Sequence, residues 1–519
     1  MKRVLILLAS ATSLLAADAI PMGSRRELFV DDHLIGGLAG RAEQRLHQPQ
    51  PQEVALTHDA PWEGSGTGYH SVFRDGGKYR MYYKAWQLTV TPGKVNTGEH
   101  PLFSCYAESD DGIHWRKPEL GLFEYKGSKA NNIVLAPGKM GGARPDPGHI
   151  AVFKDDNPAA KPESRYKAIV RSDSPKGLLA FHSPDGLRWS PMQETPVITD
   201  GAFDSQNLAF WDASAGLYRA YWRYFTGGVT DEKNWKPSGD RAIRTATSKD
   251  FLHWENPRDL AYVDSPSEQL YTNQVKPYAR APHLLLGFPT RYVERGWSES
   301  LRSLPEREHR EWRSKASDRY GMALTEGLFM ASRDGVNFKR WNEAFLPPGI
   351  ERPGTWNYGH QYIAWHLVET KSALEGAPDE LSLYATESYW TGKSSVLRRY
   401  TLRQDGFVSI HAPMSGGELI TKPLTFSGKT LTMNFASSVA GGVRVEIQDA
   451  NGAPLPGFSL ADCEELFGDS LQRSVVWKNG GDVSPLVGKV VKLRFVLKDA
   501  DLYSIKFEPK SRDGRGMSQ

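Results

Sequence analysis

A seven-residue turn motif recurs four times in the first 400 residues, and it limits the fold of this chain more than any other feature. The copies begin at Ser109, Ser183, Ser248 and Ser332, so their spacings are 74, 65 and 84 residues. They read SDDGIHW, SPDGLRW, SKDFLHW and SRDGVNF, and a degenerate fifth copy follows at 403–407. Regular self-similarity of this kind is typical of a repeat architecture, in which every copy marks one structural unit.

The residues of the motif predict a tight turn between two strands. An Asp side chain can accept hydrogen bonds from backbone amides two residues further on, and Gly adopts a positive φ that a Cβ atom resists. The aromatic residue in the seventh position is expected to anchor the turn on the core. Each copy follows a short apolar stretch, as at Ser104–Glu108 and Leu178–His182. We therefore expect these Asp residues to be structural and not catalytic.

Between the turns, pairs of segments alternate apolar and polar residues, which is the pattern of β-strands. The pairs are His70–Phe73 with Tyr79–Ala85, His149–Phe153 with Tyr166–Val170, Asn207–Trp211 with Tyr218–Trp222, Gln274–Tyr278 with His283–Phe288, and Tyr358–Trp365 with Leu381–Thr386. Five units of about four strands predict an all-β, five-bladed β-propeller over residues 20–410, with six blades as the alternative.

Composition changes near His411, and a second domain is predicted over residues 411–510. Short alternating strands and Gly-containing turns follow one another there, as at Leu431–Phe435 and Val443–Gln448. This pattern indicates a compact, jelly-roll-like β-sandwich. Residues 511–519 are polar and contain Gly, so we expect a disordered tail.

The first residues, Met1–Ala19, match an export signal. Lys2 and Arg3 precede the apolar stretch Val4–Leu15, and Ala17-Asp18-Ala19 supplies a small-residue cleavage site. The apolar stretch is shorter than the roughly 20 residues that a membrane-spanning helix needs. We therefore expect a periplasmic or secreted protein without membrane insertion after signal cleavage.

Charge and cysteine content exclude several classes of function. The chain has 64 Lys plus Arg against 61 Asp plus Glu, without a basic block, so nucleic acid is not an expected partner. Cys105 and Cys463 are the two cysteines, and they form neither a disulfide framework nor a Cys-x-x-Cys motif. His-Glu-x-x-His is also absent, so neither a metal nor another cofactor is expected.

Five segments carry a resemblance to a known group of proteins. They are Arg26–Asp32 (RELFVDD), Asp204–Asn207 (DSQN), Tyr358–His360 (YGH), Pro456–Ser459 (PGFS) and Asp499–Ser504 (DADLYS). With them, nearly all of the mature chain resembles the exported glycosyl hydrolase family 32-like proteins of planctomycete- and verrucomicrobia-type bacteria. These look like members of the five-bladed propeller superfamily that includes families 32 and 43. The invertase motif Asn-Asp-Pro-Asn-Gly is absent, which places fructan cleavage in doubt.

The resemblance implies a glycoside hydrolase, and such enzymes generally use two carboxyl groups, one as acid and one as base or nucleophile. In a propeller, the residues that begin the inner strands meet at one mouth of the axial channel. Asp204, Asp146 and Glu63 precede inner strands of the third, second and first blades, and they are the predicted catalytic residues. Acidic residues of the five-bladed families come from the same three blades.

The other predicted site residues are polar or aromatic groups near the inner strands. His70, His149, Gln206, Asn207, Asn273 and His360 are expected to bind substrate, with Trp62 and Trp356 for stacking on sugar rings. Arg144, Arg280 and Arg291 are the candidates for binding an anionic group of the substrate. Glu326 and Glu351 are possible acids from the rim.

Three functions remain open from the sequence. The first is hydrolysis of a polysaccharide or oligosaccharide, with the retaining or inverting outcome set by the separation of the carboxyls. The alternative is a non-catalytic carbohydrate-binding propeller, which needs aromatic and hydrogen-bonding groups but no carboxyl pair. A scaffold that binds protein partners is the third.

Overall fold

The computed structural model describes residues 19–230 and 234–509, and it divides into two compact units. The propeller unit comprises Gln48–Tyr278 and Pro282–Leu402, and the second unit comprises the chain up to His47, Ala279–Ala281 and the chain from Arg403. The prediction had placed residues 20–47 with the propeller. Most of the predicted export signal and the whole predicted tail lie outside the described residues. No helix in 19–230 or 234–509 is long and apolar enough to cross a membrane.

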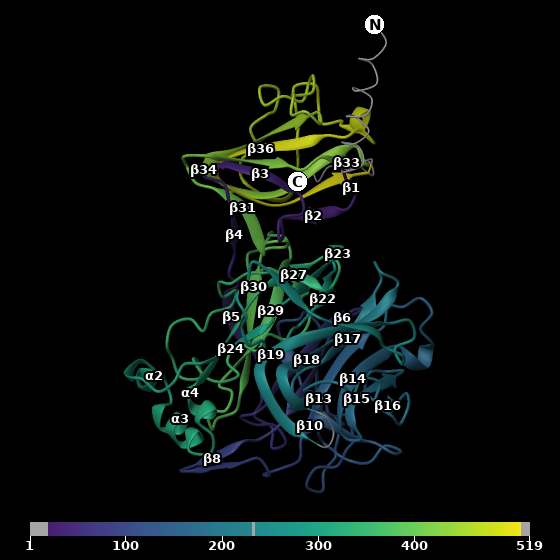
Figure 1. Ribbon diagram of the computed structural model, residues 1–519, viewed down its shortest axis with the longest axis vertical. Coiled ribbons are helices and arrows are strands. Elements are labelled where there is room, and N and C mark those ends of the chain that lie inside the picture. The colour runs from purple at the N-terminus through teal and green to yellow at the C-terminus, as the bar shows by residue number, and fades with distance from the viewer. Residues whose placement is uncertain (1–18, 231–233, 510–519) are drawn as a thin grey trace. The chain divides into compact units, whose positions relative to one another are not determined.

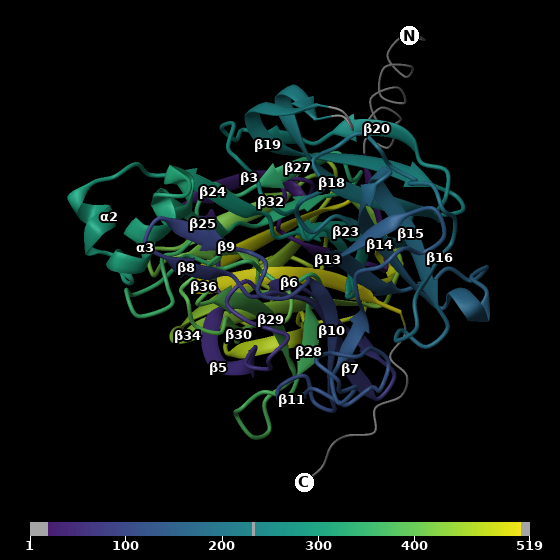
Figure 2. The same ribbon diagram turned by 90° about the horizontal axis from the view of Figure 1, so that it is seen from below.

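Five small sheets make up the propeller unit, which confirms the five-bladed prediction (Figures 1 and 2). Blade 1 contains β6 (Gly68–Asp75), β7 (Lys78–Ala85), β10 (Phe103–Ser109), β11 (Trp115–Arg116) and β12 (Ile133–Leu135). Blade 2 contains β13 (Arg144–Lys154), β14 (Tyr166–Ser174), β15 (Lys176–Ser183) and β16 (Ser190–Pro191). Blade 3 contains β17 (Leu208–Asp212), β18 (Leu217–Thr230), β19 (Trp235–Ser248) and β20 (Glu255–Asp259).

The last two blades include strands from distant parts of the chain. Blade 4 contains β22 (Lys276–Tyr278), β23 (Ala281–Gly287), β26 (Met330–Ser332) and β27 (Asn337–Arg340), with β21 (Ala261–Val263) parallel to β27. Blade 5 contains β28 (Val368–Thr370), β29 (Glu380–Glu387), β30 (Val396–Leu402) and β5 (Gln50–Thr57). Because β5 precedes blade 1 in the chain but forms the outer strand of blade 5, it closes the ring.

The repeated turns have the same hydrogen bonds in all four copies. In blade 2, Ser183 Oγ accepts from the amide of Gly186 at 2.9 Å, and Asp185 Oδ1 accepts from the amide of Leu187 at 2.8 Å. The same pair of bonds recurs at 2.8–2.9 Å in blades 1, 3 and 4, each time between the third and fourth strands. The structure therefore confirms the structural role of these Asp residues.

Two glutamines tie the blades together at the centre of the propeller. The Gln206 side chain donates to the carbonyl of Tyr69 at 3.1 Å and accepts from Gln274 at 2.8 Å. Gln274 also donates to the carbonyl of Ile363 at 2.8 Å. These bonds join blades 1, 3, 4 and 5, and both glutamines are buried.

A helical insertion interrupts blade 4 between β24 (Thr290–Glu294) and β25 (Ala323–Gly327). It consists of α2 (Glu299–Ser303), α3 (Arg307–Ser314) and α4 (Asp318–Met322). Arg310 and Arg313 of α3 are fully buried. They donate to the carbonyls of Trp356, at 2.7 Å, and Trp390, respectively. The insertion is thus fixed to blade 5 through its arginines. A hairpin of β8 (Thr89–Thr91) and β9 (Lys94–Asn96) extends from blade 1.

The second unit is a β-sandwich that includes strands from both ends of the described chain. Its strands are β1 (Ile20–Gly23), β2 (Arg26–Leu28), β3 (Ile35–Gly40), β4 (Glu43–Leu46), β31 (Val408–Ala412), β32 (Gly417–Thr421), β33 (Leu424–Phe426), β34 (Thr430–Gln448), β35 (Asp469–Ser474) and β36 (Lys492–Glu508). The long strands β34 and β36 pair along most of their length, with a break in register between Ser437 and Gly442. Around this break the sheet folds over a core that includes Phe435, Trp477 and Phe495.

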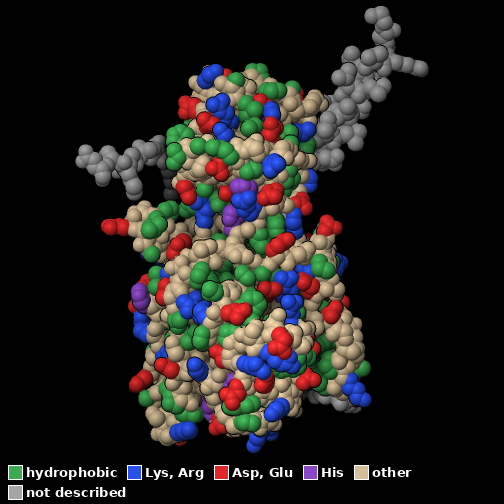
Figure 3. All heavy atoms as spheres, turned by 90° about the vertical axis from the view of Figure 1, so that its left-hand side faces the viewer, with side chains coloured by type: hydrophobic (Ala, Val, Ile, Leu, Met, Phe, Trp, Pro, Cys, Tyr) green, Lys and Arg blue, Asp and Glu red, His purple; other side chains and the backbone are tan. Residues whose placement is uncertain are grey.

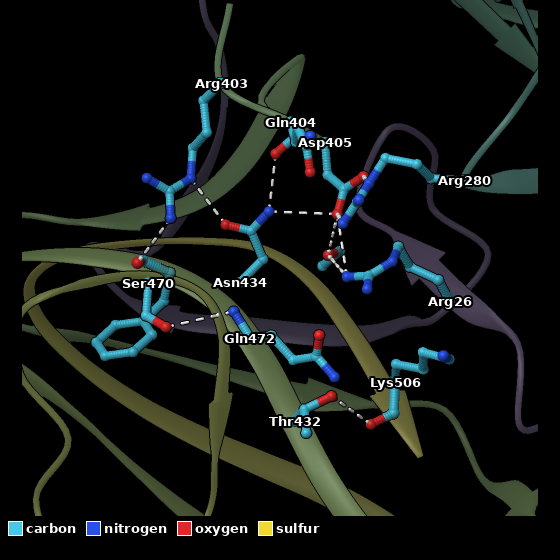
Figure 4. A network of polar contacts seen from close by, with 12 residues as sticks. Arg26, Arg280, Arg403, Gln404, Asp405, Thr432, Asn434, Ser470, Gln472 and Lys506 are labelled. Atoms are coloured by element: carbon cyan, nitrogen blue, oxygen red, sulfur yellow. Dashed lines mark hydrogen bonds and ion pairs between the residues drawn. The ribbon is translucent and has the colours of Figure 1, made fainter. Parts of the chain in front are cut away.

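The degenerate fifth copy of the motif has a different role in this unit (Figure 4). Asp405 is fully buried at φ 61°, and its carboxylate accepts from Arg280 at 2.8 Å and from Arg26 at 3.1 Å. Ser504 and Asn434 donate to the same carboxylate at 2.8 and 3.2 Å. The buried charge is therefore neutralised and hydrogen-bonded, as burial of a carboxylate requires.

On the face that Figure 3 shows, acidic and basic side chains are interspersed with apolar ones, without a continuous patch of one charge.

Candidate functional site

Asp204 lies in the loop before β17 and lines two adjoining pockets of the propeller unit. The pocket between blades 2 and 3 has a volume of 460 Å³ and is lined by Arg171, Ser172, Asp173, Lys176, Phe203, Asp204 and Trp235. The pocket between blades 3 and 4 has a volume of 420 Å³, and Asp204 and Trp235 line it together with Arg223, Phe225, Arg241, Tyr271, Glu294 and Arg319, among others. Volumes of this size can hold a sugar unit.

Arg223 of β18 holds the Asp204 carboxylate in an ion pair. The Arg223 side chain is only 2% exposed, whereas that of Asp204 is 45% exposed and accessible from the pockets. A neighbouring cation favours the charged form of a carboxyl group. Asp204 therefore presents its carboxylate to both pockets in front of a buried arginine.

Tyr271 forms part of the floor of the blade 3–4 pocket. Its hydroxyl accepts from Tyr358 at 3.0 Å, and the Arg223 guanidinium lies 4.7 Å from the centre of its ring. Burial alone would raise the pKa of Tyr271, but Arg223, the Tyr358 hydroxyl and Arg319 outweigh it and lower the pKa to about 8. The floor thus contains a phenol that can lose its proton close to neutral pH.

A layer of buried tyrosines extends from this floor across the centre of the propeller. The ring of Tyr362 lies 5.7 Å from that of Tyr271 and 5.8 Å from that of Tyr69. Tyr69 is 5.6 Å from the His149 ring, and Tyr389 is 5.7 Å from Tyr362. The layer joins aromatic rings from blades 1, 4 and 5, and Tyr69 lies next to His149 of blade 2.

Asp146 lies behind the pockets and not in their lining. It accepts from His149 Nδ1 at 2.7 Å, from the amide of Gly148 at 2.8 Å, and from Arg171 at 3.2 Å. Burial alone would raise the pKa of Asp146, but His149 and Arg171 outweigh it, so the pKa is lowered. Asp146 therefore positions Arg171, and Arg171 lines the blade 2–3 pocket that Asp204 also lines.

Glu63 and His70 lie together in a different buried cluster, next to β7. Glu63 accepts from Tyr83 and Lys117, each at 2.6 Å. His70 Nε2 is 3.1 Å from His58 Nε2, and burial lowers the pKa of His58 to about 4. Among the described residues, this cluster supplies no side chain to either Asp204 pocket.

Several predicted binding residues stabilise loops. Asn207 donates to the carbonyls of Phe203 and Ser205 at 3.0 and 2.9 Å, which shapes the loop that carries Asp204. Asn273 accepts from the amide of Val275 at 3.3 Å. His360 accepts from the amide of Trp356 at 3.0 Å and is fully buried.

The remaining predicted residues are distributed over the propeller. Trp62 lines a third pocket of 380 Å³ that it shares with Trp115 and Lys117. Trp356 donates to the carbonyl of Gly349 at 2.8 Å, and Glu326 pairs with Arg291 at 2.7 Å. Arg144 and Glu351 are exposed. The structure thus brings together Asp204 and, through Arg171, Asp146 and His149.

Sequence reasoning missed Arg171, Arg223, Arg241 and Tyr271. Arg223 directly follows the predicted strand Tyr218–Trp222, where the apolar alternation gives no sign that a charge is buried. A basic residue that ends an otherwise apolar strand was the available signal. The described residues contain no group of three or more His, Cys, Asp or Glu placed to bind a metal ion.

Comparisons with known proteins show no family for this chain. No family model and no curated protein matches this sequence. Solved structures of five-bladed glycoside hydrolase-like proteins are similar, among them an N-acetylgalactosamine deacetylase from F. plautii in complex with blood group B trisaccharide, with 12% identity, a TM-score of 0.41, and coverage of 69% of this chain and 94% of the other. A β-xylosidase has 13% identity, a TM-score of 0.38, and coverage of 69% and 97%.

A member of glycoside hydrolase family 130, the mannoside phosphorylase family that contains hydrolases of β-1,2-mannosidic linkages, has 12% identity and a TM-score of 0.38, with coverage of 68% and 94%. At these values the similarities carry no conclusion about what this protein binds or cleaves. The resemblance to family 32-like proteins stays a prediction.

Proposed function

We propose that this protein is a glycoside hydrolase that acts on a polysaccharide or oligosaccharide, with Asp204 as the ionised carboxylate at the reacting centre. The observation that carries the proposal is that Asp204 lines both adjoining pockets. A saccharide that occupies both pockets would pass over this carboxylate. The exposed ring of Trp235, which lines both pockets, offers a surface on which a sugar can stack.

Hydrolysis also needs a proton donor on the other side of the scissile bond. Glu294 and Asp173 are the other carboxyl groups that line the pockets in the described chain. Asp173 forms an ion pair with Arg171 at 2.8 Å, whereas Glu294 lines the same pocket as Asp204 and forms no ion pair among the described residues. We therefore assign the proton-donor role to Glu294, in place of Asp146 and Glu63. The predicted export signal supports action outside the cytoplasm.

The test is a screen of plant and algal glycans with the full-length protein that measures both binding and the release of reducing ends. Asp204→Asn keeps the shape of the side chain and removes its charge, so we expect a loss of about 10²–10⁴-fold or more in hydrolysis, with binding largely retained. Asp200→Asn is the matched control, because Asp200 lies on the same loop, is 78% exposed and lines neither pocket. Full activity of Asp204→Asn would remove Asp204 from the reacting centre.

Glu294→Gln tests the proton donor separately. A leaving group that departs without protonation does not need the acid, so this variant should cleave an activated aryl glycoside nearly as well as the parent and lose activity on the natural glycan. If the parent binds several glycans and cleaves none, the protein is a non-catalytic carbohydrate-binding propeller.

A further inference from the structure

The blade 3–4 pocket contains more cationic charge than its own carboxylates neutralise. Arg223, Arg241 and Arg319 line it from β18, β19 and α4. Arg223 pairs with Asp204. Arg241 donates to the neutral side chain of Gln269, and neither Arg241 nor Arg319 forms an ion pair with any carboxylate in the described part of the chain.

Several other arginines of the propeller unit do pair with carboxylates. Arg291 pairs with Glu268 and Glu326, Arg340 with Glu268, Arg352 and Arg398 with Glu387, and Arg399 with Glu53 and Glu380. The buried Arg310 and Arg313, which have no such pair, donate instead to backbone carbonyls and to Asn357. Arg241 and Arg319 thus line an open pocket without a carboxylate partner among the described residues.

Aromatic rings hold the three guanidinium groups in place. Arg223 lies 4.7 Å from the centre of the Tyr271 ring, Arg241 lies 4.2 Å from that of Tyr292, and Arg319 lies 4.7 Å from that of Tyr320. Stacked guanidinium groups lose little freedom when they bind, and their planar forks fit carboxylate and sulfate oxygens. The pocket is therefore organised before a ligand arrives.

We infer that the blade 3–4 pocket binds an anionic group of a saccharide, a uronate carboxylate or a sulfate ester, through Arg241 and Arg319. The inference rests on the proposal that the pocket holds a saccharide. It replaces the three arginines predicted from the sequence, which line neither Asp204 pocket: Arg144 is exposed, Arg280 pairs with Asp405, and Arg291 pairs with Glu268 and Glu326.

Tyr271 supplies a spectroscopic reporter for this binding. Burial disfavours the phenolate form of Tyr271, but the cationic neighbours Arg223 and Arg319 favour it more strongly. A bound anion would oppose them, so the pKa of Tyr271 should rise when an anionic saccharide occupies the pocket. The tyrosinate absorbance that appears near pH 8 should then move to higher pH, and Tyr271→Phe should lack it.

The experiment measures binding by the full-length protein with matched pairs of saccharides. Oligogalacturonate is compared with its methyl ester, and a sulfated galactan oligomer with its desulfated form, by calorimetry at two salt concentrations. We expect one anionic member to bind about 10–100-fold more tightly than its neutral partner, with affinity that falls as salt rises. The pair that shows the difference identifies carboxylate or sulfate.

Arg241→Gln and Arg319→Gln should each remove most of this preference, whereas Arg188→Gln, on an exposed turn of blade 2, should not. The inference is overturned if anionic and neutral partners bind alike, or if the preference survives both pocket variants. Binding of an anionic oligomer without cleavage of any glycan would reject the proposed hydrolase and leave the anion site standing. If the protein cleaves a neutral glycan and neither arginine variant changes that cleavage, the anion site is rejected and the proposed hydrolase stands.

Discussion

Phe251 occupies a position at which the other three turns have glycine, and replacing it with glycine is expected to destabilise the propeller unit. Its φ is 73°, close to the 75°, 77° and 81° of Gly112, Gly186 and Gly335. A residue with a Cβ atom is strained in this conformation by about 1–3 kcal/mol. On backbone conformation alone, Phe251→Gly should therefore stabilise the protein.

Side-chain packing has the opposite and larger effect. The Phe251 ring is fully buried and lies 5.2 Å from Tyr218 and 5.7 Å from Phe153 and from Trp254. Truncating a buried Phe costs about 3–5 kcal/mol, and glycine adds about 0.5–1 kcal/mol through the flexibility of the unfolded chain. After the relief of backbone strain is subtracted, the net loss of stability is centred on about 3 kcal/mol, between extremes of about 0.5 and 5 kcal/mol.

Calorimetry of the propeller transition measures this loss. Per-residue unfolding entropies give a shift of about 1–2 °C per kcal/mol for a unit of this size, so Tm should fall by about 3–6 °C. Gly186→Ala is the control in the opposite direction, because an added Cβ would lie 2.5 Å from Tyr82 Oη, and it should also lower Tm. If Phe251→Gly raises Tm while Gly186→Ala lowers it, backbone strain dominates at these turns and the reasoning from ring burial is wrong.

Two further predictions concern pH. Because the pKa of Asp146 is lowered in the folded protein, its contribution to stability is present above the unfolded pKa of about 4 and is lost as pH falls below it. Asp146→Asn should be about 2 kcal/mol less stable than the parent at pH 7, and acid denaturation should show this difference in stability disappearing below about pH 4. Burial lowers the pKa of Lys84 to about 7, so between pH 7 and about 10.4 the unfolded chain binds one more proton than the folded chain, and stability should rise with pH. Urea unfolding of Lys84→Met should lack this rise, and a variant with the same pH profile as the parent would contradict the lowered pKa.

The blades could be predicted from the sequence because their turns depend on local bonds. Asp185 binds amides two and three residues away, so the motif itself carries the structure. The sheets that β5 and the first strands of the sandwich join are set by partners hundreds of residues away, such as Leu397 for Leu56 and Leu419 for Leu38. An alternating pattern shows that a segment is a strand but not which strand it joins.

The site was predictable only in part, because side-chain direction depends on backbone detail. Asp204, which precedes an inner strand, lines both pockets, and its catalytic role stays a prediction. At the corresponding point of blade 1, Tyr69 has a φ of 56° and the register shifts between Gly68 and Ser71. Tyr69 therefore contacts His149, and His70 turns to His58. Nothing in the residue types reveals such a turn of the backbone.

The outer strand of blade 5 has a consequence for the order of folding. During synthesis β5 emerges before any blade, but its partner β30 follows only after the other four blades are complete, and the ion pair of Glu53 with Arg399 joins positions 346 apart. Until then β5 is an unpaired edge that could recruit another chain. Pro51 and Glu53 within this strand oppose such pairing, since proline lacks an amide donor and a charge disfavours stacking of sheets. The strand that closes the ring at the end of folding thus also carries the residues that oppose aggregation of the nascent chain before β30 is available.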